Sequence, residues 1–333
     1  MIKEKGKLHM NAQLKKLEEK VMNKEEISKE EALSLLQVPV EELCNSANRI
    51  REAFCKNTFD MCTIINGKCG RCSEDCKYCA QSGHYHTNCQ DSYPLLDTET
   101  ILKEAKYNAE RGVLRYSIVC SGKRLSPAEV DQVCESIRAI REQVGIEVCV
   151  SFGLLDYEQF KKIKAAGASR VHCNLETSRR YFPEVCTTHT YDEKIETLKA
   201  AQKAGLSICS GGIMGLGETM EDRIDMVLTA RELGVRSIPV NLLNPIPGTP
   251  YEKNRILTNE ELCQITAIFR FLVPDGMIRL AGGRGLVGDK GKKCFQSGAN
   301  AAISGDMLTT DGITVETDME LLKGIGYEVK LEA

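Results

Sequence analysis

Residues 114–152 read LRYSIVCSGKRLSPAEVDQVCESIRAIREQVGIEVCVSF. Short runs rich in β-branched and apolar residues stand at both ends of this stretch, in Leu114–Cys120 and Ile146–Phe152, and they predict two strands. Between them, Pro127–Gln143 keeps the spacing of an amphipathic helix and is followed by Gly145, a common helix stop. A strand, a helix and a second strand in this order predict neighbouring parallel strands.

The same order repeats along most of the chain. Six further strands are predicted, the last of them from a weaker pattern, at Met61–Asn66, Arg170–Leu175, Leu206–Gly212, Arg236–Leu242, Met277–Ala281 and Ala301–Ser304. Helical spacing fills the segments between strands, at Thr100–Arg111, Tyr157–Ala166, Asp192–Ala204, Met220–Leu233 and Asn259–Leu272. Eight strands alternating with helices predict an α/β protein with a closed (β/α)8 barrel of the TIM type.

The first 57 residues have a different pattern and predict an N-terminal helical extension. Ser28 and Glu31 have the spacing of a capping box, and helical spacing of apolar residues follows from Val40 to Phe54. Residues 58–333 are then expected to form the barrel with a C-terminal tail.

Composition excludes several classes of function. The net charge of -3 and the absence of tryptophan do not indicate a nucleic-acid-binding surface. No apolar run approaches the ~20 residues that a membrane span needs. The N-terminal residues are charged and lack an apolar signal core, so we expect a cytoplasmic protein. Sixteen cysteines in a reducing compartment suggest metal or sulfur chemistry for some, and buried packing for others such as Cys134 and Cys263.

Three of these cysteines form the run Cys72-Ser73-Glu74-Asp75-Cys76-Lys77-Tyr78-Cys79. Three thiolates at this spacing can hold three irons of a 4Fe-4S cubane and leave the fourth iron open for a small molecule. Structural zinc is the alternative, but it usually takes four ligands from paired knuckles, and no second knuckle follows at similar spacing. The motif therefore favours iron–sulfur chemistry with an open coordination site.

Other polar residues and cysteines fall where a barrel places its active site, at the C-terminal ends of strands. Cys120, Cys149 and Cys209 fall within or at the end of the second, third and fifth predicted strands. Strand alternation puts His172, Asn174 and Glu176 on one face of the fourth strand and its exit. Each cysteine alone could be a packed barrel residue, whereas three at comparable height favour a functional role.

Two loops could contact a ligand. Gly211 and Gly212 begin a glycine-rich segment that resembles a dinucleotide fingerprint, but it lies in mid-barrel and lacks the acidic residue that would bind a ribose. These glycines are more plausibly positions where the backbone approaches a ligand closely. Asn241 and Asn244 carry amides that suit a neutral urea-like ligand, although turn capping is equally common.

The cysteine run, with an aromatic residue before its last cysteine, resembles the radical S-adenosylmethionine (SAM) superfamily. Within it, the chain after about residue 50 is similar to the biotin synthases. The resemblance is carried by six segments, namely Cys72–Ser82, Asn174–Ser178, Thr187–Tyr191, Cys209–Ile213, Ile238–Asn241 and Arg279–Arg284.

This resemblance implies a sulfurtransferase that converts dethiobiotin to biotin. SAM would bind the open iron and be cleaved to a 5′-deoxyadenosyl radical, which abstracts hydrogen from the substrate. An auxiliary iron–sulfur cluster, two-iron in the family, would donate the sulfur. A flavodoxin or ferredoxin electron donor and a homodimer are also expected, and neither nucleic acid nor a membrane is an expected partner.

Site residues follow from the resemblance position by position. The 4Fe-4S ligands would be Cys72, Cys76 and Cys79, and the auxiliary ligands would include Cys149, Cys209 and Arg279. The substrate would meet Asn174, Asn241 and His172. SAM would meet Glu176, which stands where the family has an acidic residue on the ribose, together with Tyr78, Lys194, Gly211 and Gly212.

The chain departs from the family at several of these positions. His172-Cys173-Asn174 replaces a common Asn-His-Asn, Ser73 replaces a proline, and Lys194 replaces an arginine. Ser117 stands where the family has its strand-two cysteine ligand, and an alcohol is a poorer iron ligand than a thiolate.

We therefore expect Cys120 to replace that ligand. Moving the ligand in this way suggests a four-iron auxiliary cluster on Cys120, Cys149 and Cys209, completed by Arg279, Cys186 or a bound sulfide. Cys173 is a weaker candidate, because alternation turns it away from the face of Asn174.

Two other functions stay open from the sequence. One is a related radical enzyme on another small molecule, such as a hydrogenase-cofactor maturase or an amino-acid mutase. The other is an iron–sulfur carrier that does not cleave SAM. The joint presence of Asn174, Asn241 and Arg279 favours biotin synthesis over both.

Overall fold

The strands form one parallel sheet in a computed structural model that describes residues 2–87 and 92–331. Their bounds are β1 Thr58–Lys68, β2 Arg115–Cys120, β3 Glu147–Ser151, β4 Arg170–His172, β5 Ser207–Cys209, β6 Gly212–Met214, β7 Ser237–Leu242, β8 Met277–Leu280, β9 Ala301–Ser304 and β10 Glu328–Val329.

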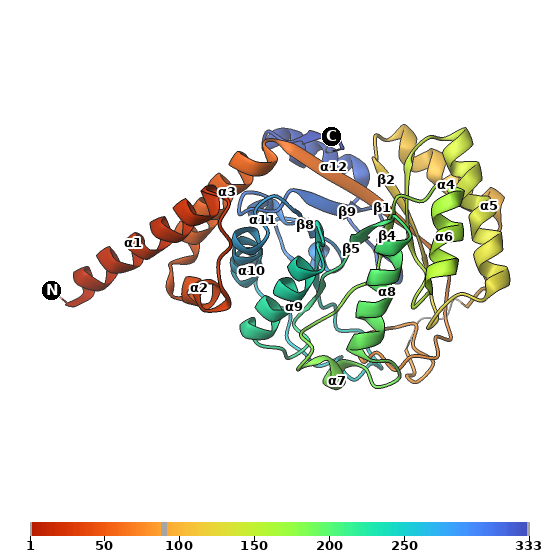
Figure 1. The fold of residues 1–333 in the computed structure, drawn as a ribbon, viewed down its shortest axis with the longest axis horizontal. Coiled ribbons are helices and arrows are strands. Elements are labelled where there is room, and N and C mark those ends of the chain that lie inside the picture. The colour runs from red at the N-terminus through yellow and green to blue at the C-terminus, as the bar shows by residue number, and fades with distance from the viewer. Residues whose placement is uncertain (1, 88–91, 332–333) are drawn as a thin grey trace.

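The sheet closes on itself, as the alternating pattern predicts. Neighbouring strands run in the order β1-β2-β3-β4-β5-β7-β8-β9, and β9 pairs with β1 in register from Asp60–Ala301 to Thr63–Ser304. The α/β class and the eight-stranded TIM-type barrel are thereby confirmed. Helices α4, α5, α6 and α8 lie outside the strands (Figure 1).

Helices α2, α4, α5, α6, α8, α9, α10 and α12 begin at a side-chain cap of Ser, Thr or Asp, whereas α3, α7 and α11 do not. Their bounds are α1 Ile2–Met22, α2 Lys29–Ser34, α3 Val40–Cys55, α4 Thr98–Glu110, α5 Pro127–Gln143, α6 Tyr157–Ala166, α7 Phe182–Val185, α8 Tyr191–Lys203, α9 Met220–Glu232, α10 Asn259–Leu272, α11 Lys292–Phe295 and α12 Val315–Gly324, with 3-10 turns η1 Leu35–Gln37 and η2 Arg284–Leu286. The predicted capping box of Ser28 and Glu31 is present at α2. Within the described part of the chain, no helix has the length and apolar character to cross a bilayer.

One predicted strand, Leu206–Gly212, is divided in the structure. Its first half is β5, and its last residue begins β6, which pairs with β7. Between them the chain moves close to β7: a Cβ on Gly211 would lie 2.1 Å from the carbonyl oxygen of Pro239. The missing side chain allows this approach, which residue pattern alone does not reveal.

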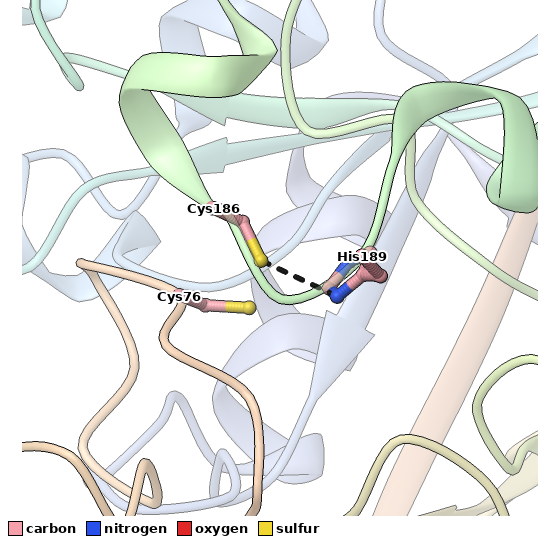
Figure 2. A group of neighbouring side chains, drawn as sticks. All are labelled: Cys76, Cys186 and His189. Atoms are coloured by element: carbon pink, nitrogen blue, oxygen red, sulfur yellow. Dashed lines mark hydrogen bonds between the residues drawn. The ribbon is translucent and has the colours of Figure 1, made fainter.

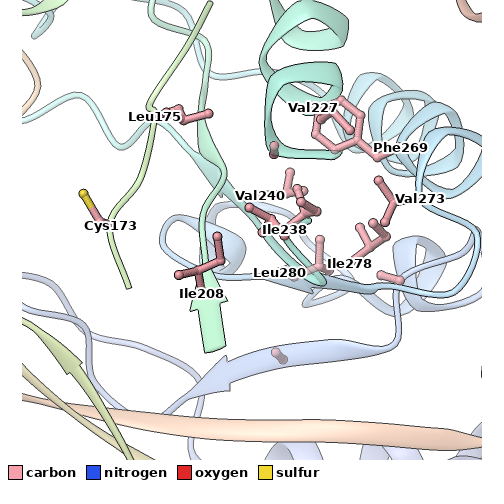
Figure 3. Packing of buried hydrophobic residues seen from close by; sticks show 14 of the residues in the cluster. Cys173, Leu175, Ile208, Val227, Ile238, Val240, Phe269, Val273, Ile278 and Leu280 are labelled. Atoms are coloured by element: carbon pink, nitrogen blue, oxygen red, sulfur yellow. The ribbon is translucent and has the colours of Figure 1, made fainter. Parts of the chain in front are cut away.

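The N-terminal helices pack on the outside of the barrel. Helix α3 lies against α10, and α2 lies against α9 (Figure 1). Lys29 of α2 donates to Asp225 of α9 at 2.8 Å. The apolar layer that joins the outer helices to the strands includes Val227 and Phe269 from the helices and Ile238 and Ile278 from the strands (Figure 3). Burial of this layer is the main force that holds helices on a barrel.

Arg270 joins α10 to the segments that lead into β8 and β9. It is fully buried, and its guanidinium donates to the carbonyl oxygens of Gly298 and Gly276 at 2.8 Å and to Oδ1 of Asn300 at 2.7 Å. We expect Arg270→Met to lower the free energy of unfolding by about 3 kcal/mol or more, because several buried acceptors lose a charged donor. Urea unfolding followed by circular dichroism measures this.

The matched control is Arg49→Met in α3. Arg49 forms an ion pair with Glu18, but its side chain is 53% exposed. Such surface pairs contribute less than about 1 kcal/mol, so this variant should unfold near the unmodified midpoint. Equal unfolding midpoints for the two variants would contradict the bracing role of Arg270.

Candidate functional site

A cavity of about 410 Å³ opens at the C-terminal ends of the barrel strands. Most of the residues singled out in the sequence line it, namely Cys72, Tyr78, Cys79, Cys120, Cys149, His172, Asn174, Glu176, Cys209, Asn241 and Arg279. Four others do not line it, namely Cys76, Lys194, Gly211 and Gly212. Its size suits a small-molecule site, and its position is the one that barrel enzymes use.

The cysteine run forms a loop after β1 that is held by its own backbone. The N–H of Cys72 donates to the carbonyl oxygen of Gln81 at 2.9 Å, and the N–H of Gly83 donates to the carbonyl oxygen of Cys72 at 2.8 Å. The N–H of Cys79 donates to the carbonyl oxygen of Cys76 at 3.0 Å. These bonds close a tight loop that carries the three cysteines.

Two acidic residues of the run hold the loop against a second segment, residues 186–190. Asp75 accepts from the N–H groups of Thr187 at 2.8 Å and Thr188 at 3.2 Å. Glu74 is buried and accepts from Oγ1 of Thr188 at 2.9 Å. Burial would raise the pKa of Asp75, but bonds donated by Thr187, Cys186 and Thr188 lower it well below its usual range. The carboxylates therefore stay charged and fix the loop.

Cys76 lies beside a pair of residues that were not predicted to share its surroundings, Cys186 and His189. Their ligand atoms lie within 4.8 Å of one another, and the Cys186 thiol and Nδ1 of His189 are 3.3 Å apart (Figure 2). Nδ1 of His189 also lies 2.6 Å from Oε2 of Glu74. Cys76, Cys186 and His189 could offer three ligand atoms to a zinc ion, but Nδ1 of His189 already pairs with the carboxylate of Glu74. The group is better described as a hydrogen-bonded chain that ends at the Cys76 thiol.

Glu176 has an oxygen with no partner. Its backbone is left-handed, with φ of 70°, where β4 has ended and Glu176 pairs with Gly212 as an isolated bridge. The hydroxyl of Tyr78 donates to Oε1 at 2.9 Å, while Oε2 is buried without a hydrogen bond. A buried carboxylate oxygen in this state costs about 1–3 kcal/mol, so the site is suited to a ligand that donates to it.

Lys194 of α8 is buried next to the same group. Its Nζ lies 5.8 Å from the ring centre of Phe182. Burial lowers the pKa of Lys194, but the neighbouring Cys173 thiol and Glu176 carboxylate raise it above its ordinary value. The structure thus provides a cation behind the loop that carries Cys76.

Gly211 and Gly212 allow the chain to approach its own neighbouring segments. A Cβ on Gly212 would lie 2.1 Å from the carbonyl oxygen of Glu176, and one on Gly211 would meet Pro239 at the same distance. Both glycines allow close backbone approach, but the partner is the chain itself and not an open cavity. Their contribution to a ligand site is indirect, because they set the position of Glu176.

The amides of Asn174 and Asn241 are both hydrogen-bonded to the backbone at the start of β6. Oδ1 of Asn174 accepts from the N–H of Gly211 at 3.1 Å. Asn241 donates to the carbonyl oxygen of Gly212 at 3.1 Å and accepts from the N–H of Gly282 at 2.9 Å. Both asparagine side chains line the cavity. His172 lines it as well, and burial lowers the pKa of its imidazole.

A second group of thiols lies deeper in the barrel. Cys149 of β3 and Cys209 of β5 are buried and line the cavity together with Arg279 of β8. Cys62 of β1 joins them, and its thiol is hydrogen-bonded to that of Cys149. This bond lowers the pKa of Cys149 to about 7 and raises that of Cys62. Strand alternation could have identified Cys62, because it shares the inward face of β1 with Asp60 and Ile64.

Beneath the thiols, Asp60 is surrounded by three arginines. Its carboxylate contacts Arg279 at 2.7 Å, Arg115 at 2.8 Å and Arg170 at 3.9 Å. Burial alone would raise the pKa of Asp60, and the three guanidinium groups lower it well below its usual range. This part of the cavity therefore carries fixed charges under the cysteines.

Three further cysteines were considered for the auxiliary cluster. Cys120 lines the same cavity as Cys149 and Cys209, but its thiol packs beside Gly67, 3.4 Å from where a Cβ would stand. Cys173 belongs to the apolar core (Figure 3). Cys186 lies at the other thiol group, beside Cys76. Of the three, Cys173 and Cys186 do not line the cavity that Cys149 and Cys209 share.

Comparison with known proteins identifies two sequence families along the chain. The radical SAM superfamily matches residues 67–230, and the Biotin and Thiamin Synthesis associated domain matches residues 239–328. A biotin synthase of Brachyspira hyodysenteriae is 57% identical over 319 residues, 96% of each chain. A biotin synthase of Akkermansia muciniphila is 58% identical over 305 residues, 92% of this chain and 95% of that one.

The fold is similar to that of a solved enzyme with a distant sequence. The crystal structure of methylornithine synthase superposes with a TM-score of 0.82, covering 95% of this chain and 97% of that one, at 18% identity. At this identity the similarity shows the shared fold alone.

The contact between Asp75 and residues 187–188 can be tested directly. We expect Asp75→Ala to increase amide hydrogen exchange at Thr187 and Thr188 roughly ten- to hundredfold, because about 1–3 kcal/mol of local hydrogen bonding is lost. Asp131→Ala is the control, since Asp131 is exposed on α5 and pairs only with Lys162. Unchanged exchange in residues 187–188 would show that the loop is held by other contacts.

Proposed function

The chain belongs to the biotin synthase family of radical SAM enzymes, and from this we propose that it inserts sulfur into dethiobiotin to form biotin. The observation that supports the proposal is the arrangement of two thiol groups at two depths of one cavity. Cys72 and Cys79 line its mouth, and Cys149 and Cys209 line its interior. A substrate between them could meet a radical on one side and a sulfur donor on the other.

We propose that the outer group holds a 4Fe-4S cluster on Cys72, Cys76 and Cys79. Three soft thiols at this spacing on one tight loop suit iron. With SAM bound, such a cluster supplies a 5′-deoxyadenosyl radical that abstracts hydrogen from an unactivated carbon. The protein's own part is to keep the loop rigid through Glu74 and Asp75 and to exclude water.

SAM is proposed to bind between this loop and Glu176. The unpartnered Oε2 of Glu176 suits the hydroxyl groups of a ribose. Tyr78 orients that carboxylate, since it donates to the other oxygen. Lys194 places a buried positive charge behind Cys76, where it can balance the carboxylate of the cofactor.

Dethiobiotin is proposed to bind at Asn174 and Asn241, with His172 beside them. A cyclic urea has both donors and an acceptor, and an amide side chain can complement both, since its nitrogen carries two N–H groups and its oxygen two lone pairs. Because Gly211, Gly212 and Gly282 already orient these amides, little ordering is needed when the ligand binds.

An auxiliary iron–sulfur cluster is proposed for the inner group, with Cys149 and Cys209 among its ligands. The donor set fits such a cluster, because these buried thiols lie above an excess of guanidinium groups. When bound, it would supply the sulfur atom of the product. We propose four irons, not the two expected from the family, because Ser117 does not provide the third thiolate on β2.

The partners and location proposed from the family are a flavodoxin or ferredoxin donor, a second copy of the chain and the cytoplasm.

The function is tested with anaerobically reconstituted protein, SAM, reductant and dethiobiotin. Biotin and 5′-deoxyadenosine, measured by mass spectrometry, are expected from the unmodified protein. Cys76→Ala should form neither, because the outer cluster loses a ligand, whereas Cys134→Ala should form both, because Cys134 is packed in the apolar core. Full formation of 5′-deoxyadenosine by Cys76→Ala would refute the assignment of the outer site.

Substrate recognition gives a separate prediction. We expect Asn174→Ala and Asn241→Ala each to weaken dethiobiotin binding roughly ten- to hundredfold, since a buried hydrogen-bond partner contributes about 1–3 kcal/mol. Isothermal titration with SAM present measures the affinity, with Asn48→Ala in α3 as the control outside the cavity. Unchanged affinity in both cavity variants would place the substrate elsewhere.

A further inference from the structure

The inner thiol group contains one cysteine that no part of the proposed function uses. Cys62 lies in β1, paired in register with Arg115 of β2 and Ile303 of β9, and it lines the cavity. Its thiol is hydrogen-bonded to the thiol of Cys149 and lies 3.3 Å from the carbonyl oxygen of Thr63. Cys62 and Cys149 stand on strands separated by β2, so the two thiols meet across the interior face of that strand.

The residue of β2 that lies between them makes this contact possible. Ser117 is paired with Ile64 of β1 on one side and with Cys149 of β3 on the other. Its side chain is small and buried, so the space in front of β2 is open to side chains from both neighbours. Thiols from β1, β3 and β5 therefore surround the same part of the cavity.

We propose that Cys62 is a thiolate ligand of the auxiliary iron–sulfur cluster, together with Cys149 and Cys209. The inference rests on the proposed function, because it assigns a ligand to the cluster proposed there. It also replaces the expectation that Cys120 provides the third thiolate.

The surroundings of Cys62 distinguish it from the structural cysteines of this chain. Cys134 is packed in the apolar core, and Cys120, although it also lines the cavity, belongs to that core and has its thiol beside Gly67. Cys62, Cys149 and Cys209 are outside that core and face the cavity with Arg279. Buried cysteines used for packing normally lie among apolar neighbours, and three that face a charged cavity are better suited to a metal.

The charges of the cavity floor support an anionic occupant. Arg115, Arg170 and Arg279 carry three positive charges, and among the described residues Asp60 is the one carboxylate with which they form ion pairs. Three positive charges against one negative charge leave an excess of two in a buried site. Buried charges are costly unless they are paired, and a cluster held by three thiolates is an anionic partner for the excess guanidinium charge.

Arg279 is assigned as a counter-cation and not as a ligand. Its Nη1 donates to the carbonyl oxygens of Asp60 at 3.1 Å and Ala302 at 3.0 Å, its Nη2 donates to Oδ1 of Asp60 at 2.7 Å, and its Nε faces Oγ of Ser237 at 3.4 Å. A guanidinium that donates from all three nitrogens offers no lone pair to iron. Three thiolates are then the protein ligands, the same number as at Cys72, Cys76 and Cys79.

The test is an iron and sulfide count with a Mössbauer spectrum of the anaerobically reconstituted holoenzyme. Cys62→Ala should lose the iron, sulfide and spectral component of one cluster, to the level of Cys149→Ala, and should still form 5′-deoxyadenosine. Ser117→Ala, Cys120→Ala and Cys134→Ala should keep the full iron content. A full iron count and unchanged spectrum in Cys62→Ala, or loss of the cluster in Cys120→Ala, would overturn the assignment.

A double variant separates ligation from a structural role. Cys62→Ser combined with Ser117→Cys moves the thiol from β1 to β2 while keeping the composition of the site. If Cys62 is a ligand, this variant should regain a second cluster that Cys62→Ser alone lacks. If Cys62 only supports the fold, the second thiol should restore nothing, and the proposal is refuted.

The two levels of inference fail in different ways. Failure of the proposed function would appear in the unmodified protein, as the absence of a second cluster and of biotin. Failure of the Cys62 assignment alone would leave both present in the unmodified protein and in Cys62→Ala.

Discussion

The buried carboxylate of Asp60 is the interaction on which the interior of this barrel depends. It belongs to β1 and pairs with guanidinium groups from β2, β4 and β8, so one side chain joins four strands. Removing one partner of a buried pair typically costs about 3–5 kcal/mol, which makes the arrangement hard to alter. It also sets the electrostatics of the cavity, because the floor keeps an excess of positive charge directly below the inner thiols.

The two thiol groups are built by different means. The outer group lies on one short loop, so local sequence brings its cysteines together, and Glu74 and Asp75 from the same loop attach it to residues 187–189. The inner group is collected from separate strands, and only closure of the sheet brings Cys62, Cys149 and Cys209 to one place. The geometry of the outer group therefore depends mainly on its own loop, whereas the geometry of the inner group depends on strand register.

Predictions from local pattern held where the relevant contacts are local. The alternation of strands and helices, the capping box at Ser28 and the loop that carries Cys72 were all visible, because each depends on residues close in sequence. Predictions that depended on which side chains of neighbouring strands lie next to one another could not be made from local pattern alone. Gly211 and Gly212 were expected to face a ligand, but they face the backbones of Pro239 and Glu176. Cys120 was expected in the inner site, and it lines the same cavity, but its thiol lies beside Gly67 and Ile118.

The sequence alone determined the class of fold, the family and the outer cysteine motif, since strand periodicity, helix caps and a short ligand spacing are local properties of the chain. The tertiary structure decided which cysteines share the interior. Residue parity states that a side chain faces inward or outward, but not which inward side chains of different strands stand at the same height. That depends on the register between β1, β2 and β3, which is set by backbone hydrogen bonds along the whole sheet. Cys62 and Cys149 therefore meet only in the closed barrel, although they are 87 positions apart in the sequence.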